Sequence, residues 1–329
     1  MNLQNRYEFL FYIECVNCNP NGDPDMGNAP RIDPQDMHGY ITDVAIKRRI
    51  RNYIQNAYKD KEGMRIIMES STNINKFIAE AHEKTDGSAS KDKTKVNAAR
   101  DYACSTFYDV RTFGAVLSTG LNAGQVRGPV QLTFARSVEP ILPLDISITR
   151  MLVAENVKGA TTPADYEKWE REQDEDKLRT IGRKQFITYG LYEARGFVSA
   201  NLAEDTGFSE DDLKILFEAI LNMYEHDRSA SKGIMSVISP LIIFKHVGTD
   251  NVADQRKRQA KLGCAPAHKL FEIFSIKKRD DIEFPRSYKD FIVTMNNDAI
   301  PKGIQIGFLE NPNGDISWDK NNSNWIENV

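Results

Sequence analysis

The chain has 329 residues, of which 40% are apolar, 9% aromatic and 27% charged, and its formal net charge at pH 7 is −4. That length can bury one large core or two ordinary ones. No apolar run approaches the roughly 20 residues that a membrane-spanning helix needs, and the N-terminus has no clear basic leader with a small-residue cleavage site. We therefore expect a cytoplasmic protein that does not bind membranes. The negative charge argues against general affinity for nucleic acid, although the segment "AIKRRIRN" is locally very basic.

The first predicted strand covers residues 6–18, where apolar side chains alternate along much of the segment. It ends in Cys15-Val-Asn-Cys18, a spacing that also occurs in zinc and redox sites. A structural zinc needs a second ligand pair, which Cys104 and Cys264 do not supply. The motif also closes a strand and does not open a helix, where a thiolate would be stabilised. We therefore expect reduced cysteines and no bound metal.

The pentapeptide Asn-Pro-Asn-Gly-Asp occurs twice, at residues 19–23 and 311–315. Proline presets the backbone for a turn, and Asn-Gly tolerates a positive φ. The second copy lies between two segments with partial apolar alternation, which predicts a hairpin turn. The first copy opens a long loop, rich in Asn, Pro, Gly and Asp, that reaches residue 39.

A helix is predicted over residues 41–58, with Thr42 as its N-cap. Helical spacing places the cations Lys47, Arg48 and Arg51 on the side opposite the apolar face, so we expect them to form a stripe exposed to solvent. Free amides at the helix start, a flexible loop and a cationic stripe together suit phosphate binding. A simple solvated face explains the same pattern equally well.

Residues 60–108 read as a polar helical insertion with a linker at 83–95, and residues 109–120 as a glycine-containing loop. A helix with a capping signal begins at Ser209 and runs to His226. Further strands are predicted at residues 128–141, 145–153, 179–202, 236–247, 291–295 and 305–309. The segment between the second and third of these strands is too polar for a core, which indicates a projecting hairpin or flexible finger.

Without the insertions, the predicted order is strand, helix, strand, strand, helix, strand. This is the α+β, ferredoxin-like arrangement that RNA-recognition modules also use.

Five segments carry a family resemblance, in this order: "FYIECVNCNPNGDPDMGNAPRIDPQDMHGYITDVAIKRRIRNYI", "DVRTFGAVLSTG", "GPVQLTFARSVEPI", "ITYGLYEARGFVSANLAEDTG" and "SEDDLKILFEAILNMYEHDRSASKG". Together they resemble the backbone subunit of the type I-C CRISPR Cascade surveillance complex, within the RAMP superfamily. The resemblance implies an RNA-recognition-like palm, a helical finger and a thumb β-hairpin. The palm would comprise 1–59, 109–147 and 185–329, the last part with the C-terminal strands; the finger would be 60–108, and the thumb 148–184.

The same resemblance implies the partners. Copies of the chain would stack head-to-tail along a guide RNA (crRNA), and the target DNA strand would be met through pairing with that guide. The small, large and 5′-handle-binding subunits of Cascade would be further partners. The resemblance implies no cofactor and no catalytic residue.

Carried over to this sequence, the resemblance implies RNA contacts along the chain. The implied residues are Asn19, Asn21, Gly22, Asn28, Arg31, Thr42, Lys47, Arg48, Arg51, Arg111, Phe113, Gly114, Arg136, Arg150, Met151, Arg183, Lys184, Ser229 and Ser231.

Several of these assignments have a structural alternative. Phe113 can stack on a base or pack inward. Gln131 and Arg136 would face opposite sides of a regular strand, so only one can contact RNA, and Arg136 is preferred. Met151 can wedge between bases or pack at the base of the thumb. The turn with Ser229 and Ser231 suits a phosphate, but a helix C-terminus with favourable cations fits it too.

Two catalytic readings compete with a scaffold. Asp23, Asp25, Asp33, Asp36 and Asp43 could hold Mg²⁺ and cleave target RNA, as backbone subunits of type III complexes do. The same residues are standard turn formers and helix caps, and three of them flank a proline. A processing ribonuclease would need a histidine, and only His38 lies near this loop. We therefore expect a protein that is not an enzyme.

Overall fold

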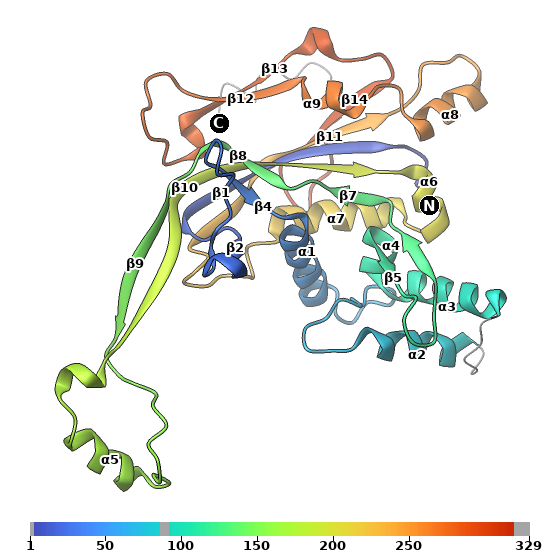
Figure 1. Cartoon of the computed structure of the whole chain (residues 1–329). Coiled ribbons are helices and arrows are strands. Elements are labelled where there is room, and N and C mark those ends of the chain that lie inside the picture. The colour runs from blue at the N-terminus through green and yellow to red at the C-terminus, as the bar shows by residue number, and fades with distance from the viewer. Residues whose placement is uncertain (1–2, 86–91, 319–329) are drawn as a thin grey trace.

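The computed structural model describes residues 3–85 and 92–318 and is built on a large antiparallel sheet (Figure 1). The strand order is β14 (Ile304–Leu309), β11 (Ile234–His246), β1 (Tyr7–Cys18), β10 (Thr180–Val198), β8 (Ala135–Pro140) and β4 (His38–Ile41). Two more strands, β7 (Val130–Leu132) and β9 (Pro143–Arg150), also pair with β10. The chain is therefore a mixed α/β fold organised around its first strand.

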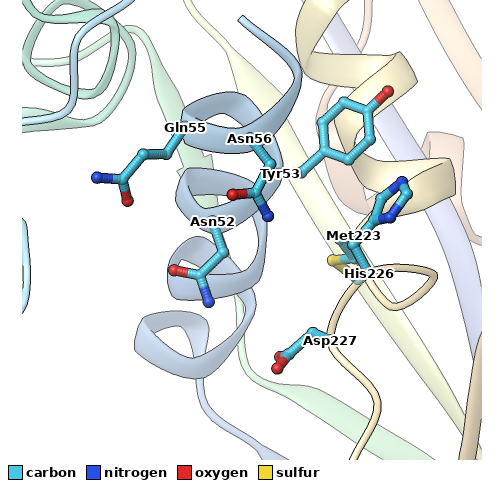
Figure 2. A pocket seen from close by; sticks show the side chains of 7 residues that line it. All are labelled: Asn52, Tyr53, Gln55, Asn56, Met223, His226 and Asp227. Carbon is cyan, nitrogen blue, oxygen red and sulfur yellow. The ribbon is translucent and has the colours of Figure 1, made fainter. Parts of the chain in front are cut away.

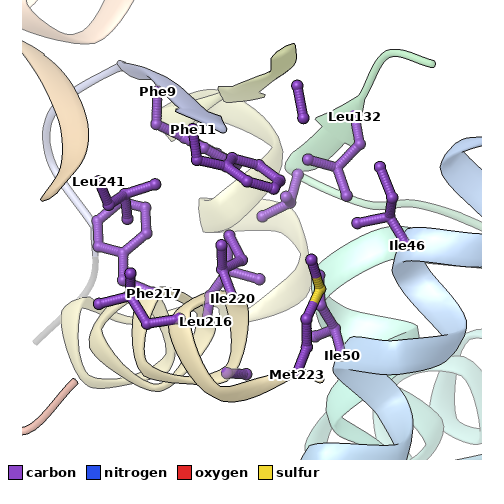
Figure 3. Packing of buried hydrophobic residues seen from close by; sticks show 14 of the residues in the cluster. Phe9, Phe11, Ile46, Ile50, Leu132, Leu216, Phe217, Ile220, Met223 and Leu241 are labelled. Atoms are coloured by element: carbon purple, nitrogen blue, oxygen red, sulfur yellow. The ribbon is translucent and has the colours of Figure 1, made fainter. Parts of the chain in front are cut away.

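Strand β1 lies in the middle of this sheet and is buried on both faces. Phe9 and Phe11 pack toward α1 (Asp43–Ala57) and α7 (Glu210–Asn222) on one side (Figure 3). Leu10 and Tyr12 belong to a second core on the opposite side. This double burial explains why the apolar alternation of β1 is incomplete in the sequence, since neither face meets water.

The second core lies under a small sheet on the outer face. Its elements are β12 (Phe274–Lys278), β13 (Phe291–Met295) and α9 (Ala267–Phe271). Phe244 of β11 meets Phe271 and Phe274 edge-on, with ring centroids about 6 Å apart. Strand β13 was expected to add to pairing near the C-terminus. It pairs with β12, which the sequence pattern did not predict.

The insertion after α1 has a small core of its own. Helices α2 (Ile74–Thr85) and α3 (Lys93–Thr106) pack against α4 (Tyr108–Phe113), and Phe77 meets Phe107 edge-on at 5.4 Å. Helices form over 74–85 and 93–106 of the segment predicted to be helical, whereas residues 60–73 contain none, and the middle of the predicted linker lies outside the described residues. The expected loop at 109–120 is wrong in its first half, where α4 forms and leads into a hairpin of β5 (Gly114–Val116) and β6 (Gln125–Arg127).

A two-stranded ribbon extends far from the sheet (Figure 1). Strand β9 pairs with the first part of β10, from Pro143 opposite Ile187 to Arg150 opposite Thr180. The tip between these strands carries α5 (Pro163–Arg171) and the 3-10 helix η2 (Glu175–Leu178), in which no residue is buried. The expected projecting hairpin is therefore present.

The helix caps follow the sequence closely. Thr42 caps α1 by accepting a hydrogen bond from the Ala45 amide at 3.3 Å. Ser209 and Asp212 form the predicted capping box of α7, although the helix ends at Asn222, four residues before the predicted end. The second Asn-Pro-Asn-Gly-Asp copy turns the chain so that Phe308 and Ser317 exchange two backbone hydrogen bonds of 2.9 Å, as expected for a hairpin.

The remaining elements are short or were not predicted. They are β2 (Gly22–Asp23), β3 (Ala29–Pro30), α6 (Ala200–Thr206), α8 (Ala253–Leu262) and the 3-10 helices η1 (Pro24–Met26), η3 (Tyr288–Asp290) and η4 (Asn297–Ala299). Within residues 3–85 and 92–318, no helix is both long and apolar enough to cross a membrane.

Candidate nucleic-acid interface

The first motif loop is held against the start of α1 by side-chain hydrogen bonds. Asn21 Oδ1 accepts from both the backbone amide and the hydroxyl of Thr42, each at 2.9 Å. Asn19 Nδ2 donates to the Asn28 carbonyl at 2.6 Å. Gly22 is required because a Cβ there would collide with the Asn28 side chain. Residues 19–22, Asn28 and Thr42 are therefore tied together by side-chain contacts.

A second turn and the base of the ribbon lie against this unit. The Asn19 amide donates to the Ser231 carbonyl at 2.7 Å, and Lys184 Nζ of β10 donates to the Ala230 carbonyl. We call this convergence of residues 19–31, the N-terminus of α1, Lys184 and residues 227–233 the loop junction. It brings together Asn19, Asn21, Gly22, Asn28, Arg31, Thr42, Lys184, Ser229 and Ser231 from the predicted RNA contacts.

The loop junction holds two buried polar atoms that lack a hydrogen-bond partner among the described residues: Asn19 Oδ1, an acceptor, and Arg31 Nε, a donor. Asn19 is 8% exposed, and the other end of the Arg31 guanidinium lies 3.2 Å from Asp23. Buried polar groups in folded proteins are nearly always paired. These two atoms are therefore candidates for bonds to a ligand with both donors and acceptors.

Two further cations, Arg49 and Lys232, meet at the loop junction, although the sequence pattern did not predict them as site residues. Asp227 is shared between Arg49 of α1 and Lys232, whose Nζ lies 2.7 Å from the carboxylate. Burial lowers the pKa of Lys232 even though Asp227 opposes that shift. Arg49 belongs to the same basic run as the three predicted cations. Nothing in the sequence indicated that Asp227 would face it.

Next to Asp227, α1 and the segment after α7 enclose a hollow of about 240 Å³ (Figure 2). The amides of Asn52 and Asn56 line it from α1, and His226 lines it from the other side. The rings of Tyr53 and His226 lie 6.2 Å apart. The face of α1 that carries Arg49, Asn52 and Asn56 is therefore the one that adjoins the loop junction.

The expected cationic stripe is not exposed. Arg51 Nε lies 2.8 Å from Asp109, and the Arg51 side chain is only 12% exposed. Arg48 donates to the Met68 carbonyl, and Lys47 pairs with Asp43 at 3.0 Å. The prediction of a solvent-facing stripe is wrong because the helical insertion packs over this side of α1. Periodicity within one helix cannot show what a later segment covers.

The segment around Arg111 is also interior. Arg111 pairs with Asp212 at 2.8 Å and donates to the Gly63 carbonyl at 2.6 Å. Phe113 packs inward, and Lys47 and Arg51 lie over its ring at 5.5 and 5.3 Å from the centroid. Of the two alternatives for Phe113, stacking on a base or packing inward, the structure shows inward packing.

Gly114 has φ of +81°, and a Cβ there would collide with the backbone of β6. The close backbone approach that Gly114 permits is therefore to another strand of the same protein. The contacts of Arg111, Phe113 and Gly114 are thus with the insertion, α1 and α7.

Arg136 is held by acidic and phenolic partners. It pairs with Asp36, lies 3.6 Å from Asp33 and donates to the Tyr40 hydroxyl at 2.6 Å. Its side chain is 43% exposed. The regular strand assumed for Gln131 and Arg136 is wrong, because the chain breaks between β7 and β8, and Gln131 is also exposed.

The other predicted contacts lie along the ribbon. Met151 follows the end of β9 and is 69% exposed, so it does not pack at the base of the ribbon. Arg150 donates to the Leu152 carbonyl at 3.0 Å. Arg183 is 79% exposed and lies 3.6 Å from Asp145. Only Lys184 of this group reaches the loop junction.

The aspartates of the motif loop serve its turns. Asp23 accepts from the Asp25 amide, Asp33 from the Gln35 amide and Asp36 from the His38 amide, each at about 3 Å. The pKa of Asp33 is lowered first by the Gln35 amide, and then by the Tyr40 hydroxyl and Arg136. Asp43 pairs with Lys47.

No group of three or more His, Cys, Asp or Glu side chains that could hold a metal occurs in the described part of the chain. His38 is bound through Nδ1 to the Ser137 carbonyl at 2.7 Å. Cys15, Cys18 and Cys104 are free and buried, and burial raises the pKa of Cys104 to about 11. A thiol with a raised pKa is a poor nucleophile at neutral pH.

Comparison with known proteins gives a family match over most of the chain. Residues 5–296 match the family model described as CRISPR-associated protein Cas7. The CRISPR-associated protein Cas7 of Haloferax volcanii is 28% identical over 237 residues, which cover 66% of this chain and 63% of that protein. The chain thus spans less than two thirds of the length of this curated relative.

Two solved chains are similar in fold over long stretches. One belongs to a "CRISPR RNA-guided surveillance complex, pre-nicking", with a TM-score of 0.45, 12% identity and coverage of 80% of this chain and 83% of that one. The other belongs to a "CRISPR RNA-guided surveillance complex", with a TM-score of 0.39, 14% identity and coverage of 75% and 74%. On the strength of the family match over residues 5–296, this chain belongs to the CRISPR-associated Cas7 family.

Proposed function

We propose that this chain is the backbone subunit of a type I-C CRISPR surveillance complex, in which it binds guide RNA without cutting it. The family match supports membership of such a complex. The observation that carries RNA binding is the loop junction, where the first motif, the 227–233 turn and Lys184 converge around the unpartnered Asn19 Oδ1 and Arg31 Nε.

The sheet order supports an RNA-recognition-like palm. Strands β11, β1, β10 and β8 are adjacent and antiparallel, and α1 and α7 lie together on one face. Numbered within the motif, these four strands follow the order 4-1-3-2 of a ferredoxin-like sheet. In this proposal the α2–α3 insertion is the finger and the β9–β10 ribbon is the thumb.

The loop junction offers the groups that a ribose-phosphate backbone needs. Arg31 Nε can donate to a phosphate oxygen, and Asn19 Oδ1 can accept from a ribose 2′-hydroxyl. Lys184 and Lys232 add positive charge beside them. These groups address the backbone and not the base edges, so the subunit would hold guides of any sequence and leave target DNA to be read by pairing. Further copies and the other Cascade subunits would complete the assembly.

A paired substitution tests this binding mode. Lys184→Ala with Lys232→Ala should weaken binding of a single-stranded RNA equally for unrelated sequences, because both cations belong to the loop junction. It should also reduce the slope of log affinity against log salt by about 1.4, because each phosphate neutralised in a single strand contributes about 0.7. Fluorescence anisotropy at several salt concentrations measures both quantities.

The control is Lys289→Ala with Lys302→Ala, which removes the same charge from exposed positions outside the loop junction. Equal losses in the two double variants would mean that only net charge matters. An unchanged salt slope in the first variant would rule out phosphate contacts there.

The absence of catalysis is also part of the proposal. The alternative is a Mg²⁺-dependent, target-RNA-cleaving subunit that uses an aspartate of the 23–43 loop. The loop carboxylates are engaged with amides and cations, which favours the structural role. Target RNA incubated with the assembled complex and Mg²⁺ should remain intact on a denaturing gel. Regular fragments that disappear in the Asp36→Ala variant would establish the enzymatic alternative.

A further inference from the structure

The tip of the ribbon is strongly acidic. Residues 154–178 contain eight carboxylates and four cations, so this short segment alone carries a net charge of −4. Three of the carboxylates pair with nearby cations of the same segment or its end, at Glu167, Asp174 and Asp176. No ion pair involves Glu170 or Glu172 in the described part of the chain, and both are exposed. A surface of this charge repels the phosphates of a nucleic acid.

Helix α8 is the chemical complement of this tip. Its sequence, "ADQRKRQAKL", contains four cations and one carboxylate. Lys261 pairs with Glu204, and Arg256 donates to the Asp250 carbonyl. Lys257 and Arg258 are exposed, and neither has an ion-pair partner among the residues described.

Both surfaces also carry exposed apolar side chains. On the tip, Tyr166 is 40% exposed, and α5 buries none of its residues. At the two ends of α8, Val252 and Leu262 are 60% and 53% exposed. Charge complementarity with a few apolar anchors is the pattern of a protein–protein contact, in which aromatic side chains are enriched at the centre.

The two surfaces cannot meet within one molecule. The ribbon carries the tip away from the sheet on one side, while α8 lies at the opposite end of the molecule (Figure 1). We propose that the acidic tip of one copy, around Glu170 and Glu172, docks on the Lys257 and Arg258 face of α8 in a second copy. Two different patches at opposite ends form a heterologous contact, which repeats from copy to copy and does not close on itself unless the rotation allows it. This inference rests on the proposed function in one respect, because it requires that copies of the chain assemble in series.

Charge reversal tests the contact. Glu170→Lys with Glu172→Lys reverses the tip, and Lys257→Glu with Arg258→Glu reverses the helix. Each double variant should weaken self-association by about tenfold or more, because two attractive pairs become repulsive. The chain that carries all four substitutions should regain association, because a basic tip then meets an acidic helix. All four positions are exposed, so the fold tolerates the changes.

Self-association is measured by sedimentation of the full chain at low salt, both without RNA and on an RNA long enough for several copies. Affinity for a short RNA that admits one copy is measured in parallel.

Loss of association in both double variants with no recovery in the fourfold variant would overturn the contact. A wild-type chain that does not self-associate in either condition would overturn it as well. A helix variant that loses short-RNA affinity would assign α8 to nucleic acid and overturn the docking. A wild-type chain that associates but does not bind the short RNA would leave the docking standing and remove the proposed RNA function.

Discussion

At the scale of a single residue, the carboxylate of Asp109 connects three segments of the chain through hydrogen bonds. It is 1% exposed and accepts from the amides of Ile67 and Met68 at 2.9 and 3.2 Å. Its third bond comes from Arg51 Nε at 2.8 Å. A buried carboxylate needs this full set of donors, because desolvation without compensation is costly. Arg51 therefore supports the fold directly.

Substitution of Arg51 by alanine should consequently destabilise the protein. We expect the free energy of unfolding to fall by about 3–5 kcal/mol, the usual result of leaving one buried charge without its partner. Denaturant unfolding followed by circular dichroism measures this change. Arg171→Ala is the control, because Arg171 forms an exposed pair within α5 and should not shift the midpoint. A normal midpoint for Arg51→Ala would show that the ion pair contributes little.

At the scale of an element, the ribbon of β9 and β10 is the part of the fold that depends least on the cores. From Ser147 opposite Arg183 outward, its side chains are mostly exposed. An isolated two-stranded ribbon is marginally stable in water. Its length and exposed apolar side chains, such as Ile148 and Ile181, suit an element whose surroundings are completed by a partner.

Shortening the ribbon should therefore leave the folded body intact. Replacing residues 148–182 by Asn-Gly joins Ser147 to Arg183, which face each other in the register. The free energy of unfolding should change by less than about 1 kcal/mol, because a shorter connection costs less entropy to close. Urea denaturation checks this, and self-association should be lost in the same variant. A large loss of stability would mean that the ribbon contributes to a core.

At the scale of the whole molecule, local signals in the sequence predicted most elements but not their contacts. The caps at Thr42 and Ser209 and the hairpin turn at 311–315 depend on neighbouring residues, and all three formed as expected. The prediction that Arg51 is exposed was wrong because Arg51 pairs with Asp109, which lies 58 residues away in the sequence. The Arg49–Asp227 pair was missed for the same reason. Burial and ion pairing depend on tertiary contacts, which one helix's periodicity does not contain.

Strand β10 is a single element of 19 residues that serves two parts of the molecule. Its second half pairs with β1 along the middle of the sheet, and its first half forms one side of the ribbon. Lys184 lies in the ribbon half, near Ile187 where the two halves meet, and donates to the Ala230 carbonyl. One continuous strand therefore connects the exposed ribbon to the middle of the sheet, and its contact with the 227–233 turn lies on the ribbon side of that connection.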